Sequence, residues 1–496
     1  MLDFDSCYLA VSSRDARFDG RFYTGVTSTG IYCRPICPAR TPARRNVRFY
    51  PDASAAEAAG FRPCKRCRPE SSPGSPEWDV RGDLVGRALR LIDDGVVDET
   101  GVRGLASRLA VTERHLHRLF VAEIGAAPLM VARTRRLQFA RRLLRETGMP
   151  VTDVAFASGF GSVRQFNASM REAYGLAPSE LRNGAGRPPG LVLRLAFRKP
   201  YDSAGLLALL SAQAVPGVES VTSGRYLRTV PGGTIELVPH DDHVLLRASI
   251  TAGSRRGEGS RAVDSRPGAG LRGLAGMVAR CRRLFDLDAD PYAVNQVLGA
   301  DPLLAGLVRA RPGLRVPGAY DGFEAAVRAV LGRQASAAGA RVLLGRVVAR
   351  CGAPAADPAP GDATFAGADR TLTHVFPSAA AVAEADLGGL GLSEGRTRAL
   401  HALATAVASG ELDLDGGADP AETTAKLLAL PGIGPSAVSA IRMRALRDPD
   451  AFPAADPVLH RALDRLGTDL AHTEAWRPWR AYAAAHLWAA EPDAAS

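Results

Sequence analysis

Apolar residues between Leu84 and Arg182 recur at the three-to-four-residue spacing of amphipathic helices. An imperfect repeat lies in this stretch: a set of two apolar residues, a glycine and a proline occurs twice in the same order. The second set follows the first by fifty residues, and the two sets are Leu116, Phe120, Gly125 and Pro128, then Phe166, Met170, Gly175 and Pro178. Each copy predicts a helix, a short turn and a second helix. A long helix from about Pro128 to Glu146 is predicted to join the two copies.

The pattern changes after residue 190. Alternating apolar and polar side chains are typical of half-buried strands and predict Leu191–Phe197, Ile235–Val238 and Val244–Ala248 as strands. A helical stretch, Ser203–Ala214, lies between the first two. From Leu271 the helical spacing returns and continues to the end. This order predicts a small α+β domain followed by an all-α domain.

Segments rich in Gly, Pro and Ser separate these regions. Ser71–Gly82 and Asn183–Gly190 are predicted to be linkers, and Thr251–Gly270 and Gly352–Gly367 to be flexible loops. A chain of 496 residues is long enough for several domains with sizeable cores. We expect four domains, covering residues 1–72, 83–183, 190–288 and 289–490.

Charge is distributed unevenly along the chain. The formal net charge is +10, and residues 1–182 hold 28 Lys and Arg against 20 Asp and Glu, which is +8 of that total. A basic region of this kind favours nucleic acid as a partner. No apolar run reaches the roughly 18 residues of a membrane span, and Asp3 and Asp5 lie at the start of the chain. These features predict a cytoplasmic, nucleoid-associated protein that does not contact a membrane.

Four of the seven cysteines form two close pairs: Cys33 and Cys37 in C-x3-C, and Cys64 and Cys67 in C-x2-C. Two such pairs can converge on one tetrahedral ion, and thiolate is a ligand that zinc prefers in closed sites. We therefore expect Zn²⁺ as the cofactor. Disulfides are the alternative, which an intracellular chain disfavours. A purely structural zinc ribbon is the stronger rival. The isolated Cys7, Cys281 and Cys351 are expected to be ordinary thiols.

The residues around these cysteines distinguish a reactive zinc site from a purely structural one. Three segments, Thr29–Arg40, Asn46–Tyr50 and Gly60–Cys67, closely resemble the amino-terminal domain of the Ada-type methylphosphotriester repair proteins. The resemblance covers roughly residues 4–70. It implies that Cys33 is both a zinc ligand and a methyl acceptor, which takes a methyl group from a DNA phosphotriester and keeps it.

The residue types suit this chemistry because the thiolate is the nucleophilic form of cysteine. A zinc site with four thiolates carries a formal charge of 2−, and methylation of one sulfur would reduce it to 1− and weaken its repulsion of phosphates. The surrounding arginines are expected to supply a positive rim that binds DNA, or alternatively a merely solvated basic face: Arg34, Arg40, Arg44, Arg45 and Arg48.

The helical repeat resembles the AraC-type DNA-binding unit, in which two helix-turn-helix motifs are joined by a long helix. Two recognition helices on a fixed spacer can enter successive major grooves, about 34 Å apart. Expected DNA-reading residues, each with surface solvation as the alternative, are Glu113, Arg114 and His117 in the first copy and Ser162, Arg164 and Gln165 in the second. An activator of this kind also implies RNA polymerase as a partner, beside double-stranded DNA.

A second chemical centre is expected near Leu430–Gly434. This Leu-Pro-Gly-Ile-Gly stretch predicts a helix-hairpin-helix, whose glycine turn at Gly432 and Gly434 presents backbone amides to a DNA phosphate. Asp456 follows twenty-two residues after Gly434. Its plain interpretation is a helix N-cap, with Pro457 at the first helical position.

The sequence from about residue 190 to residue 490 resembles the AlkA-type 3-methyladenine DNA glycosylases. The segments that carry this resemblance are Pro200–Asp202, Ala214–Glu219, Arg283–Leu287, Leu430–Gly434 and Arg477–Tyr482. In that family the aspartate at the Asp456 position is catalytic, and the target base is flipped into a pocket between domains. A carboxylate there would stabilise the oxocarbenium-like sugar and orient water.

The resemblance also implies a base pocket, where this chain departs from its family. Positions that carry aromatic rings in the best-studied enzymes are Leu209, Ser436 and Ala440 here, and Trp488 is retained. Gln334 is expected to fill the gap left by the flipped base, or else to be an ordinary surface glutamine.

Three missing features narrow the enzyme class. Related bifunctional glycosylase/lyases carry a lysine where Ser436 stands, and no four-cysteine run for an iron–sulfur cluster follows the glycosylase region. A Pro-Cys-His-Arg motif, which a second methyltransferase would carry, is also absent. We therefore expect a methyl-sensing transcriptional activator fused to a monofunctional glycosylase of alkylated bases. The alternative is a regulator whose glycosylase fold only binds DNA or senses lesions.

Overall fold

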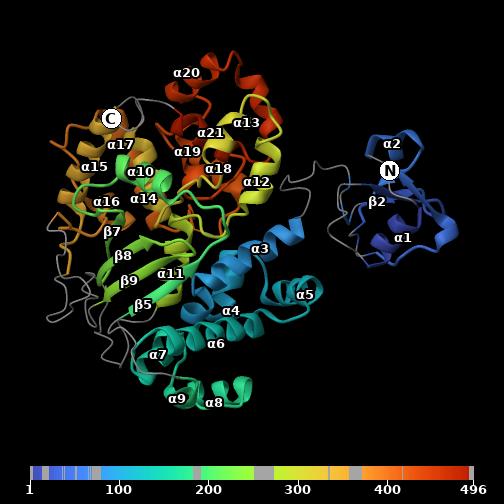
Figure 1. Cartoon of the computed structure of the whole chain (residues 1–496), viewed down its shortest axis with the longest axis horizontal. Coiled ribbons are helices and arrows are strands. Elements are labelled where there is room, and N and C mark those ends of the chain that lie inside the picture. Colours follow the sequence, from blue (N-terminus) through green and yellow to red (C-terminus); the bar gives the residue numbers. More distant parts are fainter. Residues whose placement is uncertain are drawn as a thin grey trace. The chain divides into compact units, whose positions relative to one another are not determined.

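The structure is a computed structural model of the chain, and it describes residues 4–13, 22–35, 37, 39–50, 53–64, 66–67, 69, 80–182, 191–250, 273–332, 336–356, 371–415 and 417–490. The chain divides into two compact units, Met1–Gly86 and Arg87–Ser496. Figure 1 shows both units and labels most of their elements. The boundary between the units falls inside helix α3 (Val80–Asp93).

The first unit is built on a small four-stranded sheet with the order β3-β1-β2-β4. Strands β1, β2 and β3 pair antiparallel, whereas β4 joins β2 in parallel. This arrangement confirms the expected small α/β zinc domain. Its elements are α1 (Phe4–Ser13), β1 (Tyr23–Val26), β2 (Ile31–Cys33), the 3-10 helix η2 (Arg44–Asn46), β3 (Val47–Tyr50), α2 (Ala53–Ala58) and β4 (Arg62–Pro63).

The described buried side chains of this unit gather in small clusters rather than in one core. One joins Cys7, Ala10, Val11 and Phe22, and another joins Tyr23, Tyr32 and Ala56. Aromatic rings pack edge to face within the first cluster, where the centroids of the Phe22 ring and the adjoining Phe49 ring lie 5.3 Å apart. Clusters of three or four residues bury little apolar surface, and small domains of this kind usually need a metal or a disulfide.

The helix-turn-helix region begins with α3 and is entirely helical where it is described. The long connecting helix α6 runs Pro128–Glu146, as predicted. The two copies of the repeat end alike, because Gly125 and Gly175 both adopt the left-handed backbone that suits glycine. The remaining helices are α4 (Val96–Arg108), α5 (Glu113–Glu123), α7 (Val151–Ala157), α8 (Val163–Tyr174) and α9 (Pro178–Leu181).

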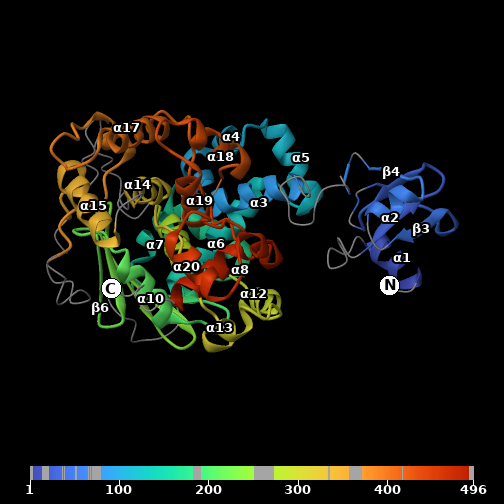
Figure 2. The same cartoon turned by 90° about the horizontal axis from the view of Figure 1, so that it is seen from above.

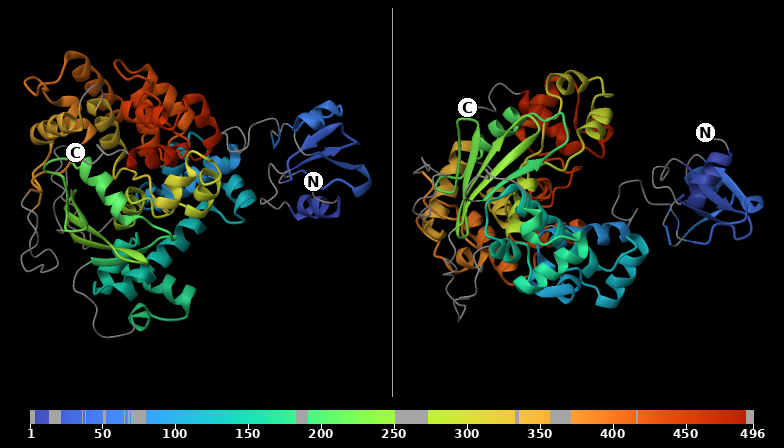
Figure 3. Two further views of the ribbon diagram at one scale, coloured as in Figure 1. Left: turned by 45° about the horizontal axis from the view of Figure 1, so that its top comes forward. Right: turned by 60° about the horizontal axis from the view of Figure 1, so that its bottom comes forward.

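An antiparallel sheet with the order β5-β9-β8-β7-β6 follows. Helix α10 (Ser203–Ala212) packs against its β6–β7 side, and Figure 3 shows the strands side by side with this helix. The α+β prediction is confirmed, but the sequence pattern had not indicated β6 or β7. The strands are β5 (Leu191–Ala196), β6 (Glu219–Thr222), β7 (Arg225–Val230), β8 (Gly233–Pro239) and β9 (His243–Ile250).

From α11 onward the described chain is helical, as predicted. Figure 2 shows these helices, drawn from yellow to red, grouped beside the sheet. They are α11 (Leu274–Leu284), α12 (Pro291–Leu298), α13 (Ala305–Ala310), α14 (Gly322–Gly332), α15 (Ala337–Cys351), α16 (Ala379–Glu384), α17 (Glu394–Ala408), α18 (Pro420–Ala429), α19 (Pro435–Arg444), α20 (Pro457–Arg465), the 3-10 helix η5 (Leu470–Trp476) and α21 (Arg480–Ala489).

A buried network of charges joins the sheet to the helices. Arg228 of β7 donates to Glu324 of α14 at 2.8 Å, and Arg328 of α14 donates to Glu219 of β6 at 2.5 Å. Arg228 and Glu324 are each exposed by no more than 2%. Burial alone would raise the pKa of Glu219, but Arg328 and Arg228 lower it to about 2. The charges therefore stay ionised and paired inside the protein.

Three predicted loops or linkers can be set against the described residues. The linker expected over Ser71–Gly82 is too long by three residues, because α3 already begins at Val80. The predicted linker Asn183–Gly190 and the predicted loop Thr251–Gly270 lie outside the described residues. Among the helices that the structure describes, none is both long and apolar enough to cross a membrane.

Candidate metal centre and glycosylase site

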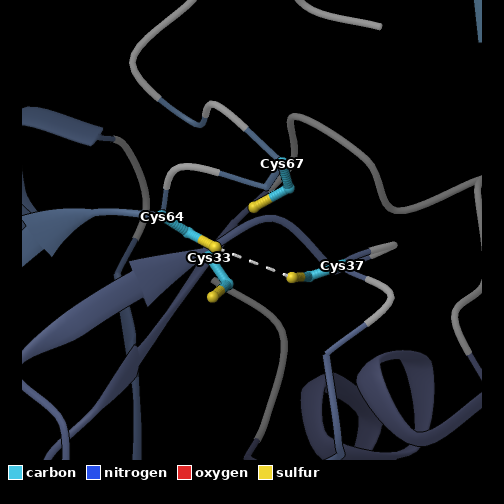
Figure 4. A group of neighbouring side chains, drawn as sticks. All are labelled: Cys33, Cys37, Cys64 and Cys67. Atoms are coloured by element: carbon cyan, nitrogen blue, oxygen red, sulfur yellow. Dashed lines mark hydrogen bonds between the residues drawn. The ribbon is translucent and has the colours of Figure 1, made fainter. Parts of the chain in front are cut away.

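Two chain segments bring the four paired cysteines together. Cys33 ends strand β2, and the backbone amide of Cys64 donates to the carbonyl of Tyr32 at 3.0 Å, which sets β4 beside β2. All four sulfur atoms lie within 4.8 Å of one another, and the Sγ atoms of Cys37 and Cys64 are 3.9 Å apart. Figure 4 shows the four sulfurs turned toward one another.

The spacing of the sulfurs fits a zinc ion. Four thiolates at about 2.3 Å from a tetrahedral zinc lie about 3.8 Å from each other. The four thiols lie so close together that their pKa values are linked: hydrogen bonding to Cys37 and Cys67, together with burial, raises the pKa of Cys33, whereas the bond to Cys33 lowers the pKa of Cys37 to about 2. A divalent cation held by the four sulfurs would stabilise all four thiolates. The four cysteines are thus positioned to bind zinc.

Accessibility distinguishes Cys33 from the other three cysteines. Cys37, Cys64 and Cys67 are each 8% exposed, whereas Cys33 is partly exposed. A group that takes an alkyl carbon from DNA must be reached from outside. The greater exposure of the Cys33 residue is compatible with a role as the acceptor.

The arginines near this centre occupy two kinds of environment. Arg34 is only 2% exposed; its backbone amide donates to Cys67 Sγ at 3.4 Å and its guanidinium to the Cys67 carbonyl at 3.3 Å. Arg40, Arg44 and Arg45 are exposed, although Arg44 pairs with Asp5. Arg34 therefore supports the metal loop, and a basic surface is left to the other arginines: Arg40, Arg44, Arg45 and Arg48.

The predicted DNA-reading residues lie on the second helix of each helix-turn-helix motif, apart from Ser162, which is the N-cap of α8. Arg114 and His117 are exposed on α5, and Arg164 and Gln165 are exposed near the start of α8. The two helices begin in the same way, because the hydroxyls of Thr112 and Ser162 each accept a backbone amide three residues on, at 3.2 Å. Equivalent caps give the two helices equivalent N-terminal geometry.

The helix-hairpin-helix forms as predicted, from α18 and α19. Its turn bends at Gly432, whose φ of +79° suits glycine, and a Cβ at this position would lie 3.0 Å from the Cβ of Ala399. Gly432 is exposed and Gly434 is partly exposed, directly before Pro435 at the first position of α19. The N-terminus of a helix of this length favours a phosphate.

Asp456 is the N-cap of α20 and is partly exposed. Both cap hydrogen bonds end on one carboxylate oxygen: Oδ1 accepts from the amide of Val458 at 2.7 Å and from that of Leu459 at 3.2 Å. The capping role therefore occupies Oδ1, and no described residue bonds to Oδ2, so the carboxylate keeps a second oxygen for another partner. Capping and catalysis are compatible in this geometry.

The residues aligned with the base pocket lie on three helices. Leu209 is on α10, Ser436 and Ala440 are on α19, and Trp488 is on α21, all partly buried. Trp488 packs against the core cluster that includes Leu459 of α20. Gln334 lies outside the described residues.

Besides the buried charges of Arg228, Glu324 and Glu219, this half buries further ionisable groups that the sequence pattern did not indicate, among them Asp286 and His486. Asp286 is 5% exposed and accepts from the Tyr482 hydroxyl at 2.7 Å; burial raises its pKa to about 6. His486, on the same helix as Trp488, is 3% exposed, and burial, with Arg311 nearby, lowers its pKa to about 4. Asp286 lies in the Arg283–Leu287 stretch that carries the family resemblance, but the residue types around either group do not show that its side chain is buried, so only the fold could indicate it.

Comparisons with known families match three parts of the chain. The metal binding domain of Ada matches residues 6–70, a helix-turn-helix domain matches residues 105–184, and the AlkA N-terminal domain matches residues 192–321. The family resemblances drawn from the sequence are thereby confirmed.

Relatives that match longer stretches of the chain support the same family assignment. A probable bifunctional transcriptional activator/DNA repair enzyme AlkA of Mycobacterium tuberculosis is 46% identical, over 98% of this chain and 96% of its own. DNA-3-methyladenine glycosylase 2 of Escherichia coli is 32% identical, over 60% of this chain and 96% of its own. The bifunctional transcriptional activator/DNA repair enzyme Ada of Escherichia coli is 38% identical, over 44% of this chain and 58% of its own. The chain belongs to the family of bifunctional transcriptional activator/DNA repair enzymes that unite an Ada-type zinc domain with an AlkA-type glycosylase.

Proposed function

We propose that this protein repairs alkylated DNA at two separate centres and reports the damage as a transcriptional activator. The observation that carries the proposal is the pairing, in one chain, of a four-sulfur cluster whose Cys33 is accessible with a helix-hairpin-helix followed by a capping aspartate with one free oxygen. The first group suits irreversible alkyl transfer, and the second suits hydrolysis of a glycosidic bond.

At the first centre the Cys33 thiolate attacks the methyl carbon of a DNA methylphosphotriester. The sulfur–carbon bond forms as the carbon–oxygen bond breaks, and the phosphodiester leaves with the electron pair and a negative charge. Bound zinc keeps the sulfurs deprotonated at neutral pH. Arg34 fixes the loop by bonding to the Cys67 carbonyl, and exposed Arg40 and Arg45 attract the DNA backbone.

Methylation converts the same region into a stronger DNA binder. Because the centre loses one negative charge, operator affinity should rise, and the gain should shrink with added salt. The residues that would read the operator lie on α5 and α8: Arg114, His117, Arg164 and Gln165. We place this binding in the cytoplasm, at the nucleoid. The bound activator would then recruit RNA polymerase.

At the second centre Asp456 acts on a flipped alkylated base. Gly432 and Gly434 hold a backbone phosphate, and the free oxygen of Asp456 stabilises positive charge on the sugar and orients the attacking water. Trp488 is the aromatic surface retained for the base, whereas Leu209, Ser436 and Ala440 offer no ring. A cation between aromatic faces gains about 0.5–2 kcal/mol per ring. Discrimination in favour of cationic bases should therefore be weak and rest on Trp488.

The test is release of free base from alkylated duplex DNA by wild type and by Asp456→Asn. The amide keeps the oxygen that caps α20 but removes the charge, so release should fall on the order of 10²-fold or more. Asp290→Asn is the matched control, because Asp290 also caps a helix with proline at its first position. Near-normal release by Asp456→Asn with unchanged DNA binding would leave this residue as a cap only.

The methyl-transfer centre is tested in the same preparation with methylphosphotriester DNA. One methyl group per chain should appear on Cys33, and Cys33→Ser should take up none. Methyl groups on Cys37, Cys64 or Cys67, or uptake that survives Cys33→Ser, would contradict the assignment.

A further inference from the structure

Within the second unit, the C-terminal half of α3 lies against the start of the helix-hairpin-helix. The Nε atom of Arg87 donates to the Gly417 carbonyl at 2.8 Å, and its Nη1 atom donates to Asp419 Oδ2 at 3.1 Å. The Arg87 side chain is only 11% exposed. Residues 332 positions apart thus share a partly buried, charge-assisted contact, in which the Asp419 side chain is 35% exposed.

Asp419 is the N-cap of α18, the first helix of the hairpin. Its Oδ1 accepts the backbone amides of Ala421 and Glu422, both at 3.0 Å, while its Oδ2 holds Arg87. The two carboxylate oxygens therefore have separate tasks, one within the hairpin and one toward α3. Arg87 fixes the orientation of the carboxylate on which α18 begins.

The packing around this contact leaves no room for added atoms. A Cβ on Gly417 would lie 2.5 Å from Leu91 Cδ1, and Leu91 is fully buried. A Cβ on Gly276, in α11 of the glycosylase half, would lie 2.7 Å from the backbone carbonyl oxygen of Asp94. Asp94 also pairs with Arg283 of α11, with both side chains largely buried.

A second contact lies at the other end of the helix-turn-helix region. The Arg194 amide of β5 donates to Glu146 Oε2 at the end of α6, at 2.9 Å. Buried residues of α6, α7 and α8 belong to the same core cluster as residues of the sheet and of α11. The two regions thus share a continuous apolar core, which is the feature of a single folding body rather than of linked domains.

We propose that the C-terminal half of α3, Arg87–Asp93, is a latch: it docks the helix-turn-helix region on the helix-hairpin-helix, and Arg87 is a positioning residue for base excision although it lies outside the base site. The glycosylase would then depend on the regulatory region for the placement of its phosphate-binding hairpin. The proposal rests on the proposed glycosylase activity for its kinetic test but not for its structural one.

The experiment compares Arg87→Gln and Gly276→Ala with wild type in the full chain. Arg87→Gln removes the guanidinium, and Gly276→Ala pushes the Asp94 carbonyl away while alanine remains a good helix residue. Their controls are Arg108→Gln, whose pair with Asp415 is long, at 3.9 Å, and exposed, and Gly306→Ala, where an added Cβ meets nothing within 4 Å.

Two readouts decide the outcome. Hydrogen exchange of the peptide that begins α18 should accelerate in both latch variants and in neither control. The KM for alkylated duplex should rise about fivefold, equivalent to about 1 kcal/mol, with kcat within twofold of wild type. If one latch variant fails to fold, the other still gives both readouts.

Unchanged exchange and unchanged KM in both latch variants would overturn the proposal. Failure of the proposed function would look different: wild type itself would release no base, and the exchange measurement alone would then decide whether the latch exists.

Discussion

The methyl-acceptor unit and the glycosylase half each give one residue two tasks, but they place that residue differently in the fold. Cys33 is one of four sulfurs that hold the centre of a unit whose described buried clusters contain three or four residues. Asp456 caps a helix at the edge of a half that has extensive apolar cores. Chemistry and stability are therefore inseparable in the first region and separable in the second.

The largest effect should come from a zinc ligand that is not the acceptor. Cys37→Ala should abolish zinc binding and unfold the first unit, because structural zinc typically contributes about 10–16 kcal/mol to the folding of such domains. Zinc content and limited proteolysis would measure this, with residues 417–490 staying resistant. Cys351→Ala, which removes an isolated thiol, should change neither. A Cys37→Ala protein that retains one zinc per chain would break the comparison.

Much of this contrast could be predicted from sequence where the signal is local. The cysteine spacing, the long helix α6 and the glycine turn of the hairpin each occupy a short stretch, and all three formed as predicted. Strand β7 was missed because it buries a charged residue, Arg228, whose partner Glu324 lies 96 positions away. The contact between Arg87 and Asp419 was missed for the same reason: pairing across such distances leaves no periodic trace.

The second prediction sharpens the claim that the glycosylase half is stabilised by its interior. Glu324→Gln leaves Arg228 and Arg328 buried without one of their counter-charges, so the free energy of unfolding should fall by about 3–5 kcal/mol. Glu394→Gln is the control, since Glu394 makes the same i,i+4 pair with Arg398 at an exposed site. That change should cost about 0.3–0.5 kcal/mol. Denaturant unfolding measures both, and equal losses would contradict the prediction.

The third prediction concerns acid stability. The pKa of His486 falls from 6.5 to about 4 on folding because the ring is buried. Between these two pH values the imidazole is therefore protonated in the unfolded chain and neutral in the folded one. Stability should therefore be lost as pH falls from about 6.5 toward 4, by about 3 kcal/mol in full. Asp286, whose pKa is raised to about 6, works in the opposite direction in part of this window. The difference between wild type and His486→Gln isolates the histidine, and a difference that does not vary with pH would contradict its burial as a neutral ring.

The most direct test of the central claim is to strip zinc from wild-type protein and measure methyl uptake and base release in one sample. The account predicts that methyl uptake by Cys33 is lost, because its unit no longer folds, while base release stays within about twofold of the zinc-loaded protein, since the metal adds folding energy only where it binds. Loss of both activities together would show that the glycosylase depends on the zinc unit and would contradict the separation of the two centres.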